Sequence, residues 1–364
     1  MFNKTFLLLL FSLFWLSGCG GPTVVREKPT IEDKVQFAEN DAEKTFKQAR
    51  DYYDKENFKI AALGYQKAAD MGLPEAQNNL GFMFYEGKGV TQNFSKAKNW
   101  FYKAAEQGVA DAQYNLARMY HIGKGIKQDL DQALLWYRKA AKQGDTKALY
   151  SLGLMNYMGE GVQQNFTQAE KWYREAAEKG EVKAQFNLGQ MYHKGEGITQ
   201  SFIEAKRWFY KAAEQGDIEA QYRLGLMYHK GDGIVQDFTQ AEKWFRKAAK
   251  KEHAKAQSAL GQLYYQGKGV KKNSSEAIYW SRKAADLGVS DAQNNLGMMY
   301  YKGDGVSKDL ILAYKWVSLA AAQGNKKAVK GRNFLINELS VEQIAKGENL
   351  IRKWSQKQSK QNRH

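Results

Sequence analysis

Apolar residues recur along most of the chain with a fixed period of 36 residues. A tryptophan, a leucine and two alanines each keep this period through seven consecutive repeats. The series are Trp100, Trp136, Trp172, Trp208, Trp244, Trp280 and Trp316; Leu80, Leu116, Leu152, Leu188, Leu224, Leu260 and Leu296; Ala76, Ala112, Ala148, Ala184, Ala220, Ala256 and Ala292; and Ala97, Ala133, Ala169, Ala205, Ala241, Ala277 and Ala313. Such a period is typical of arrays in which each repeat packs only on its neighbours.

The first half of each repeat has the spacing of a helix with one apolar face. In the first repeat this face consists of Ala76, Leu80, Met83 and Phe84. A Gly-x-Gly follows in every repeat, and glycine permits the positive φ angle of a turn. The pattern therefore predicts a helix that ends at a glycine turn.

The second half of each repeat begins with a residue that favours helix N-caps. These residues are Asn93, Asp129, Asn165, Ser201, Asp237, Asn273 and Asp309. Phe94, Ala97, Trp100 and Ala104 then form an apolar stripe, so we expect a second helix whose tryptophan lies in the core between repeats. A glycine suited to a helix C-cap follows in most repeats, and Glu252 is the exception.

The whole pattern predicts an all-α protein, a right-handed α-solenoid of antiparallel helix pairs. Seven repeats tile residues 73–324 as 73–108, 109–144, 145–180, 181–216, 217–252, 253–288 and 289–324. We expect residues 41–72 to form a shortened N-terminal capping repeat and 325–354 to form C-terminal capping helices, with Ser340 at a helix start. The basic tail, 355–364, is expected to be frayed.

The N-terminus has the order of an export signal. Residues 1–18 contain one charged residue, Lys4, then an apolar core and two small residues. The core is shorter than the roughly 20 residues that span a bilayer. The four residues that end at Cys19, Leu-Ser-Gly-Cys, resemble the bacterial lipobox, which implies lipidation of Cys19 and removal of 1–18. An ordinary secretory signal with an incidental cysteine is the alternative.

The residues from Cys19 onward indicate in which membrane the protein would be anchored and how. Residue 20 is Gly20 rather than Asp, which for a lipoprotein favours the outer membrane of the cell envelope. Residues 19–40 are polar with two prolines, and we expect a flexible tether.

The repeated motifs resemble those of the Sel-one-like repeat family, a relative of the tetratricopeptide repeats. They read Ala-x-x-x-Leu-Gly-x-x-Tyr, Gly-x-Gly, Ala-x-x-Trp and Lys-Ala-Ala-x-x-Gly. Ala117 replaces the glycine after leucine, and Asn156 replaces the aromatic residue. The resemblance implies a tetratricopeptide-like solenoid and a role in binding proteins, with the concave groove formed by the first helix of each repeat.

Three positions on the first helices are candidates for that groove. Two places before the recurrent leucine stand Tyr114, Tyr150, Phe186 and Tyr222, and five places after it stand His121, Tyr157, His193 and His229. The position two after the leucine varies most, with Phe82, Arg118, Leu154, Gln190 and Leu226. Variation beside an aromatic column suggests a ligand surface, where aromatic anchors often dominate binding. The alternative is that the rings only pad neighbouring helices.

Composition narrows the possible chemistry. The formal charge of +16 favours acidic partners, and basic residues recur on the second helices. These are Arg138, Lys139, Arg174, Lys211, Arg246, Lys247, Arg282 and Lys283. They indicate either a solvated face or contact with anionic lipid or glycan, whereas the export signal argues against nucleic acid.

Catalysis finds little support. The histidines at one repeat position should lie about 10 Å apart, too far to share a metal, and no cofactor motif is present. Ser95 and Lys98 fit Ser-x-x-Lys without the companion motifs of a β-lactam hydrolase. We therefore expect a membrane-anchored adaptor that binds a protein or peptide. An envelope-glycan binding factor is the alternative, and a hydrolase a weaker one.

Overall fold

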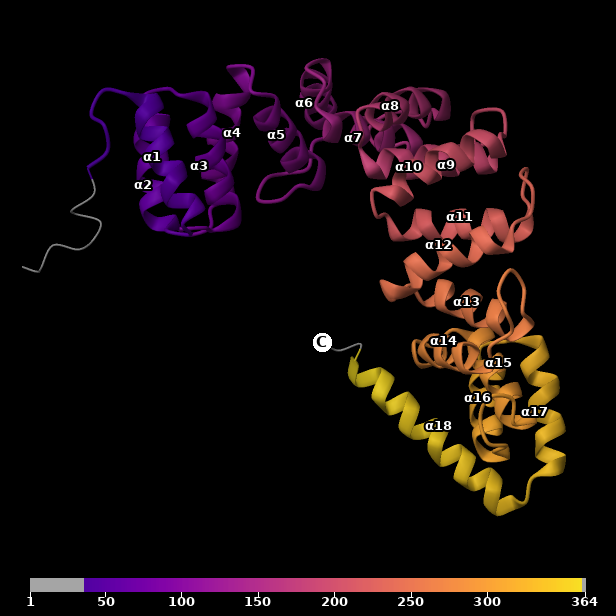
Figure 1. The fold of residues 1–364 in the computed structure, drawn as a ribbon. Coiled ribbons are helices and arrows are strands. Elements are labelled where there is room, and N and C mark those ends of the chain that lie inside the picture. Colours follow the sequence, from indigo (N-terminus) through magenta and orange to yellow (C-terminus); the bar gives the residue numbers. More distant parts are fainter. Residues whose placement is uncertain (1–35, 362–364) are drawn as a thin grey trace, which may run out of the picture. The chain divides into compact units, whose positions relative to one another are not determined.

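The computed structural model describes residues 36–361, so the predicted signal peptide, Cys19 and most of the predicted tether lie outside the described residues. All regular secondary structure within residues 36–361 is helical, which confirms the predicted all-α class (Figure 1). The chain forms two compact parts that divide between Gln92 and Asn93.

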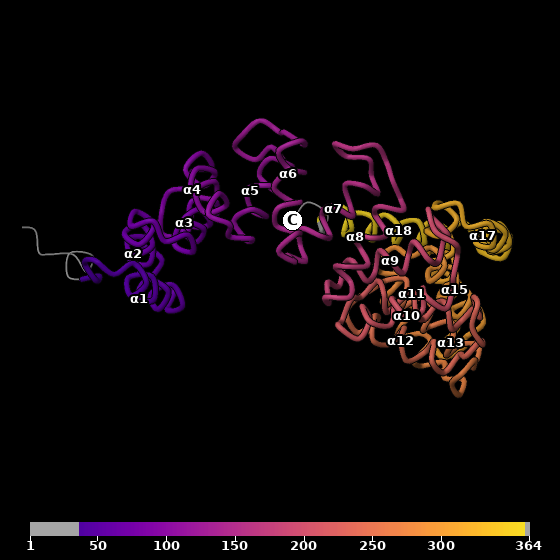
Figure 2. The backbone as a smooth tube through the Cα atoms, turned by 90° about the horizontal axis from the view of Figure 1, so that it is seen from above, coloured from indigo at the N-terminus to yellow at the C-terminus, as the bar shows by residue number. Residues whose placement is uncertain are grey.

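The described residues contain 18 helices, and all but the last have 13 residues. In chain order they are α1 Ala42–Asp54, α2 Phe58–Asp70, α3 Pro74–Glu86, α4 Phe94–Glu106, α5 Ala110–Ile122, α6 Leu130–Lys142, α7 Thr146–Met158, α8 Phe166–Glu178, α9 Val182–Lys194, α10 Phe202–Glu214, α11 Ile218–Lys230, α12 Phe238–Lys250, α13 Ala254–Gln266, α14 Ser274–Asp286, α15 Ser290–Lys302, α16 Leu310–Ala322, α17 Lys326–Glu338 and α18 Val341–Gln361. In the second part, each helix from α4 to α16 contacts the next along the chain, and Figure 1 draws α9 to α13 one after another. Figure 2 gives the view turned by 90°, in which these helices overlap.

The first part contains α1 to α3. The ring of Phe37 packs directly against Gly64 of α2. A Cβ atom at Gly64 would be 2.5 Å from that ring, so a larger residue does not fit there. The Thr45 hydroxyl donates to the carbonyl of Ala38 at 3.0 Å. Phe37 and Ala38 are therefore attached to the first helices, and the flexible tether predicted for residues 19–40 is too long at its C-terminal end.

The repeat of 36 residues arises from two 13-residue helices, a seven-residue loop and a three-residue turn, as in α5, 123–129, α6 and 143–145. Every N-cap residue predicted for the second helices accepts a hydrogen bond from a backbone N–H of the first turn, which confirms those seven caps. The first helix of each repeat ends at the first loop glycine in the left-handed region, as at Gly123 with φ 66°. Local capping therefore fixes both ends of the long loop.

The two helices within a repeat approach each other over a glycine. At Gly225 of α11, a Cβ atom would lie 2.6 Å from the ring of Phe245 on α12. Gly189 and Gly153 receive the rings of Phe209 and Tyr173 in the same way. These rings are almost completely buried, although the apolar stripe predicted from the sequence does not include them. In these three repeats the residue after the tryptophan, rather than the tryptophan alone, fills the middle of the repeat.

The tryptophans lie between repeats, as predicted, but two of them are not fully in the core. Trp244 belongs to a cluster with residues of α10 and α11 and makes an edge contact with Tyr210, with ring centroids 5.7 Å apart. Trp136, Trp208, Trp244, Trp280 and Trp316 are buried, whereas Trp100 and Trp172 are partly exposed. The prediction that all seven are core is therefore wrong for Trp100 and Trp172.

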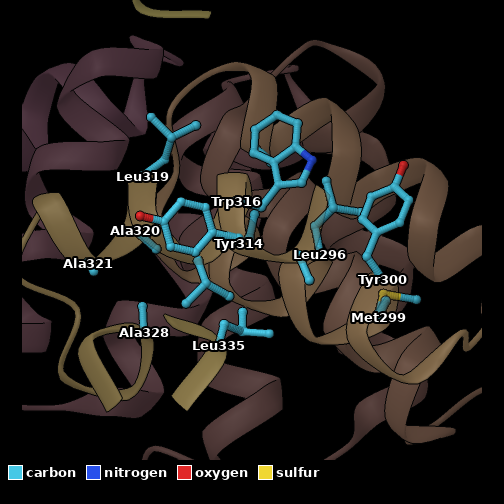
Figure 3. Packing of buried hydrophobic residues seen from close by; sticks show 14 of the residues in the cluster. Leu296, Met299, Tyr300, Tyr314, Trp316, Leu319, Ala320, Ala321, Ala328 and Leu335 are labelled. Carbon is cyan, nitrogen blue, oxygen red and sulfur yellow. The ribbon is translucent and has the colours of Figure 1, made fainter. Parts of the chain in front are cut away.

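Two further helices cover the end of the array. Figure 3 shows Tyr314 and Trp316 of α16 beside Leu296 of α15 and Leu335 of α17. The Tyr314 hydroxyl donates to Glu348 of α18 at 2.7 Å, so α18 packs back against α16.

The last helix begins with a reciprocal capping box, in which Ser340 Oγ accepts from the N–H of Gln343 at 3.2 Å and Gln343 Oε1 accepts from the N–H of Ser340 at 2.9 Å. This cap was predicted. The frayed tail expected from residue 355 is wrong, because α18 continues to Gln361. Gln358 Nε2 donates to the carbonyl of Asp286 at 2.8 Å and holds this last stretch against α14. In the range 36–361, no helix has both the length and the apolar character needed to cross a membrane.

The difference between buried and partly exposed tryptophans is testable. Trp208, 1% exposed, should lose about 3–5 kcal/mol of unfolding free energy on substitution by alanine, as expected for a large truncation in a packed core. Trp172→Ala, at the equivalent position of the preceding repeat, should cost clearly less. Urea unfolding of both variants measures the two losses. Equal losses would show that exposure does not distinguish these positions.

Candidate functional site

The four rings two places before the recurrent leucines are partly buried on the first helices. Each packs on the buried ring that the second helix of its own repeat contributes. The pairs are Tyr114 with Tyr137, Tyr150 with Tyr173, Phe186 with Phe209 and Tyr222 with Phe245, with centroids 5.7–5.9 Å apart. The rings therefore do pad the helices, and only part of each faces outward.

The second row packs on the other side of the same buried rings. The pairs are His121 with Tyr137, Tyr157 with Tyr173, His193 with Phe209 and His229 with Phe245, with centroids 5.9–6.5 Å apart. Each of these four repeats thus holds three rings, one from each row around a central buried ring, which we call the aromatic trio. The trio fixes the position of both outer rings.

Side chains of the second row also reach the loop of the following repeat. His121 Nε2 lies 2.8 Å from Glu160 Oε2, and the Tyr157 hydroxyl donates to Glu196 at 2.6 Å. His193 is 4.0 Å from Asp232 in the same arrangement. The acidic partner is the residue between the two loop glycines. These contacts connect neighbouring repeats along the row.

Two cavities lie on this face. One, of about 310 Å³, lies between α7 and α9, and the other, of about 360 Å³, extends over α11, α13 and α15. Tyr150 and Tyr157 line the first, and Tyr222 and His229 line the second. The structure therefore brings the two predicted rows together at two places. The remaining candidates line neither cavity: Tyr114, Arg118, His121, Phe186 and His193.

The position that varies most along the chain contributes to the same cavities. Leu154 and Gln190 line the first, and Leu226 and Gln262 line the second. Arg118, at the same position of an earlier repeat, is exposed on α5. Each cavity therefore combines fixed aromatic walls with side chains that differ between repeats.

His253 was not singled out in the sequence, although it stands where two other repeats have Asp145 and Asp217 as N-caps. Its Nδ1 accepts from the N–H of Ala256 at 3.1 Å, and its Nε2 lies 3.0 Å from Glu219 Oε2. The imidazole stacks on Tyr222 with centroids 4.6 Å apart. His253 thus caps α13 and positions a ring of the second cavity. The signal in the sequence is a histidine in a series of N-cap positions.

Burial acts on the pKa values of three members of the second row. Burial lowers the pKa of His193 and of His229 below the ordinary histidine value. Burial, together with the hydrogen bond to Glu196, raises the pKa of Tyr157 to about 12. The charges around the cavities come instead from Lys194, Lys230, Lys255 and Asp291.

Many basic residues of the second helices have partners inside the protein. Arg174 pairs with Glu170 at 2.8 Å and also donates to the hydroxyl of Tyr192. Arg246 pairs in the same way with Glu242 and Tyr264. Lysine side chains lie over tryptophan rings of the same helices, in the pairs Lys103 with Trp100, Lys139 with Trp136, Lys211 with Trp208 and Lys247 with Trp244. Much of this basic row therefore stabilises the repeats themselves.

The sequence also offered two candidates for chemistry, the histidines as metal ligands and the Ser-x-x-Lys pair. Among the described residues, no three His, Cys, Asp or Glu side chains are grouped so that they could hold a metal ion. Ser95 is exposed in the first turn of α4, and the Lys98 ammonium lies 5.5 Å from the ring of Tyr120. Both residues of the Ser-x-x-Lys match therefore belong to an ordinary helix surface.

Comparison with known proteins gives a consistent result. The family described as the Sel1 repeat matches seven consecutive segments, 74–109, 110–145, 146–181, 182–217, 218–253, 254–289 and 290–325. No curated protein matches the sequence. Among solved structures, the chain resembles a Sel1 repeat protein from Oxalobacter formigenes at 33% identity and a TM-score of 0.62, over 81% of this chain and 87% of that one.

A second solved structure is similar over a comparable length. It is c5321, a protective antigen present in uropathogenic Escherichia coli strains and displaying an SLR fold. The identity is 29% and the TM-score 0.59, over 86% of this chain and 84% of that one.

The lowered histidine pKa values predict a loss of stability in acid. Because the unfolded histidines have a pKa near 6.5, the unfolded chain binds more protons than the folded chain as the pH falls through that value. The free energy of unfolding should therefore decrease between about pH 6.5 and the lower folded-state pKa values. His193→Tyr with His229→Tyr, which places at both sites the tyrosine found in other repeats, should reduce this pH dependence. Urea unfolding at pH 7 and pH 5 measures it, and identical pH dependence in both proteins would contradict the assignment.

Proposed function

The chain belongs to the Sel1-repeat family, and we propose that it is a membrane-tethered adaptor of the bacterial envelope that binds a protein or peptide along its first helices. Sel1-like and tetratricopeptide-like repeat proteins generally mediate protein–protein interaction. The observation that supports the groove is the pair of cavities, each lined by members of both aromatic rows and by residues that vary between repeats.

The aromatic trios suit these cavities to binding. Their rings are fixed by internal packing before a partner arrives, so binding orders few side chains and loses little conformational entropy. Tyr150 and Tyr222 each present a partly exposed face next to a variable position. The proposed partner is a peptide with apolar side chains for these faces and acidic side chains for Lys230 and Lys255.

The basic residues of the second helices give weaker support for a binding surface. The envelope-glycan alternative depends on free cationic groups there, but Arg174 and Arg246 are engaged with glutamates and tyrosines. A protein or peptide partner on the first helices is therefore the function that the arrangement of side chains favours.

The membrane tether is a separate proposal that rests on residues 1–19. The lipobox-like sequence before Cys19 favours an acylated N-terminus, and Gly20 favours the outer membrane. Two or more acyl chains give stable anchoring, whereas one gives reversible binding. The repeats would then be held at an envelope surface.

Site-specific photocrosslinking tests where the partner binds. We expect a photoreactive amino acid at Gln190 or Gln262, which line the two cavities, to give a discrete adduct in envelope extracts. Neither residue belongs to an aromatic trio, so the change should leave the fold intact. The measurement is adduct yield by gel shift, followed by identification of the captured peptide.

The matched controls are Lys171 and Lys243, which are exposed on the second helices of two repeats. A photoreactive residue there should give little adduct. Adducts at the controls without adducts at Gln190 and Gln262 would place partner binding on the second helices and contradict the groove.

The proposed lipid anchor can be tested by replacing Cys19. Cells grown with labelled palmitate should label the protein, and Cys19→Ser should abolish the label and move the protein from the membrane fraction to the soluble fraction. Ser17→Ala, which keeps a small residue in the lipobox, serves as the control and should still be labelled. Unchanged labelling in Cys19→Ser would disprove lipidation at this residue.

A further inference from the structure

Neighbouring repeats are joined by a buried glutamine that lies near the start of a first helix. In the second part of the chain, Gln113, Gln185, Gln221, Gln257 and Gln293 occupy this position, and in each the side-chain amide donates to a carbonyl at the end of the preceding second helix at 3.0–3.1 Å. The side-chain oxygen then remains as a buried acceptor. A hydrogen-bond acceptor that is buried without a donor destabilises the folded state.

Three joints supply the donor from a second glutamine, 30 residues further along the chain. Gln143 donates to Gln113 at 2.9 Å, Gln215 to Gln185 at 2.8 Å and Gln323 to Gln293 at 2.9 Å. Two of these amides also donate to a carbonyl of the preceding turn: Gln143 to Gly108 at 2.8 Å and Gln215 to Gly180 at 3.3 Å. A primary carboxamide with two N–H groups thus fills the joint.

The joints at Gln221 and Gln257 have no such donor, and the Oε1 atom of each is buried without a hydrogen-bond partner within the described residues. After Gln221 the residue 30 positions further on is Lys251, whose ammonium donates to the carbonyl of Gly216 at 3.0 Å. After Gln257 it is Leu287, whose side chain has no hydrogen-bonding group, so this joint lacks a polar side chain at that position. Gln257 is 1% exposed, and its Oε1 atom has no hydrogen-bond partner within the described residues. Leu287 itself is 55% exposed.

A cavity of about 340 Å³ lies at this joint. Gln257, Leu287 and Glu252 line it, and the last helix contributes Trp354 and Lys357. Glu252 is the residue whose carbonyl corresponds to those of Gly108 and Gly180 at the other joints. The indole Nε1 of Trp354 is also buried without a partner within the described part of the chain. The cavity is therefore lined by one residue with an unpaired acceptor and by another with an unpaired donor.

The backbone at the rim of the cavity is unusual. Glu252 has a φ of 63°, in the left-handed region, at the position where the other repeats have a glycine. A non-glycine residue in that region carries backbone strain, and such strain clusters at binding sites. Glu252 therefore adds a carboxylate side chain to the lining of this cavity, where the other repeats have a glycine without a side chain.

We propose that this cavity is a second binding site, which receives the glutamine side chain of a partner peptide. The carboxamide N–H groups donate to Gln257 Oε1 and to the carbonyl of Glu252, as Gln143 does at its own joint. The carboxamide oxygen accepts from Trp354 Nε1 or from the ammonium groups of Lys283 and Lys357, which also line the cavity. The site shares no residue with the cavities on the first helices, so it stands independently of the groove.

The hydrogen-bonding groups of the cavity favour a primary carboxamide over a carboxylate, a secondary amide or an amine. A carboxylate has no N–H for Gln257 Oε1, and the secondary amide of an N-acetyl sugar has one N–H instead of two. A cationic amine would be repelled by Lys283 and Lys357, whereas Glu252 and Asp286 oppose an anion. The neutral carboxamide satisfies both the acceptor and the donors.

Indole N–H resonances of the full chain labelled with ¹⁵N-tryptophan test this site directly, with the Trp354 signal assigned by Trp354→Phe. The probes are the peptides acetyl-Ala-Gln-Ala-N-methylamide and acetyl-Ala-Glu-Ala-N-methylamide, which differ only in the end of one side chain and have no primary carboxamide at the C-terminus. We expect the glutamine peptide, at up to about 10 mM for a site of millimolar affinity, to shift the Trp354 signal. The glutamate peptide should leave it in place.

Leu287→Gln provides the matched variant. It restores the internal donor found at three other joints, so it should fold, fill the cavity and abolish the shift, whereas Leu287→Met should retain it. The other indole signals report whether the fold is preserved. A Trp354 signal that does not respond to the glutamine peptide, responds equally to both peptides or still responds in Leu287→Gln would overturn the proposal. A response to N-acetylglucosamine alone would also overturn it and assign the cavity to glycan.

Discussion

The approach of the two helices in a repeat depends on a position without a side chain. The glycine after the recurrent leucine allows the ring of Phe245 to lie against α11 at Gly225, and the ring of Phe209 to lie against α9 at Gly189. Once that ring is fixed, the outer rings on either side of it are fixed as well, because they pack on its two flanks. Where Ala117 replaces the glycine, Tyr137 remains buried, and its hydroxyl lies 3.4 Å from His121 Nδ1. The face proposed for binding is therefore the outer side of the core.

The contacts between repeats obey a different constraint. Alanines and tryptophans bury apolar surface there, but such contacts have little directionality and would tolerate small slips. The buried glutamines add hydrogen bonds with a defined geometry, so they fix the register of one repeat on the next. Departures from the pattern are then informative. At Leu149 the buried glutamine itself is missing, whereas at Lys251 and Leu287 only the partner glutamine is missing, and the acceptors of Gln221 and Gln257 have no partner within the described residues.

The period of the sequence predicts helices, caps and repeat boundaries because these depend on local spacing and on residues such as Asp129 or Ser340. It does not predict how deeply each member of a series is buried. Trp172 and Trp208 are equivalent in sequence, yet only Trp208 is fully buried, because exposure depends on the side chains of neighbouring repeats. The length of α18 was also missed: its end is polar in composition, and its stability comes from Gln358 and Trp354 packing on α14 and α16, far away in the sequence.

In the candidate site, too, local spacing predicts which residues form a row, whereas the packing of each residue depends on its neighbours in space. The sequence identified the aromatic rows from their spacing, and the structure places Tyr150 with Tyr157 and Tyr222 with His229 in shared cavities. It could not show that these rings also hold the repeat together. Because removal of such a ring weakens the fold and the proposed surface at once, an alanine substitution there cannot separate the two roles. Variable residues such as Gln190 and Gln262 line the same cavities but lie outside the trios. Specific recognition must depend on these positions, because the trios give the four repeats that contain them nearly the same aromatic background.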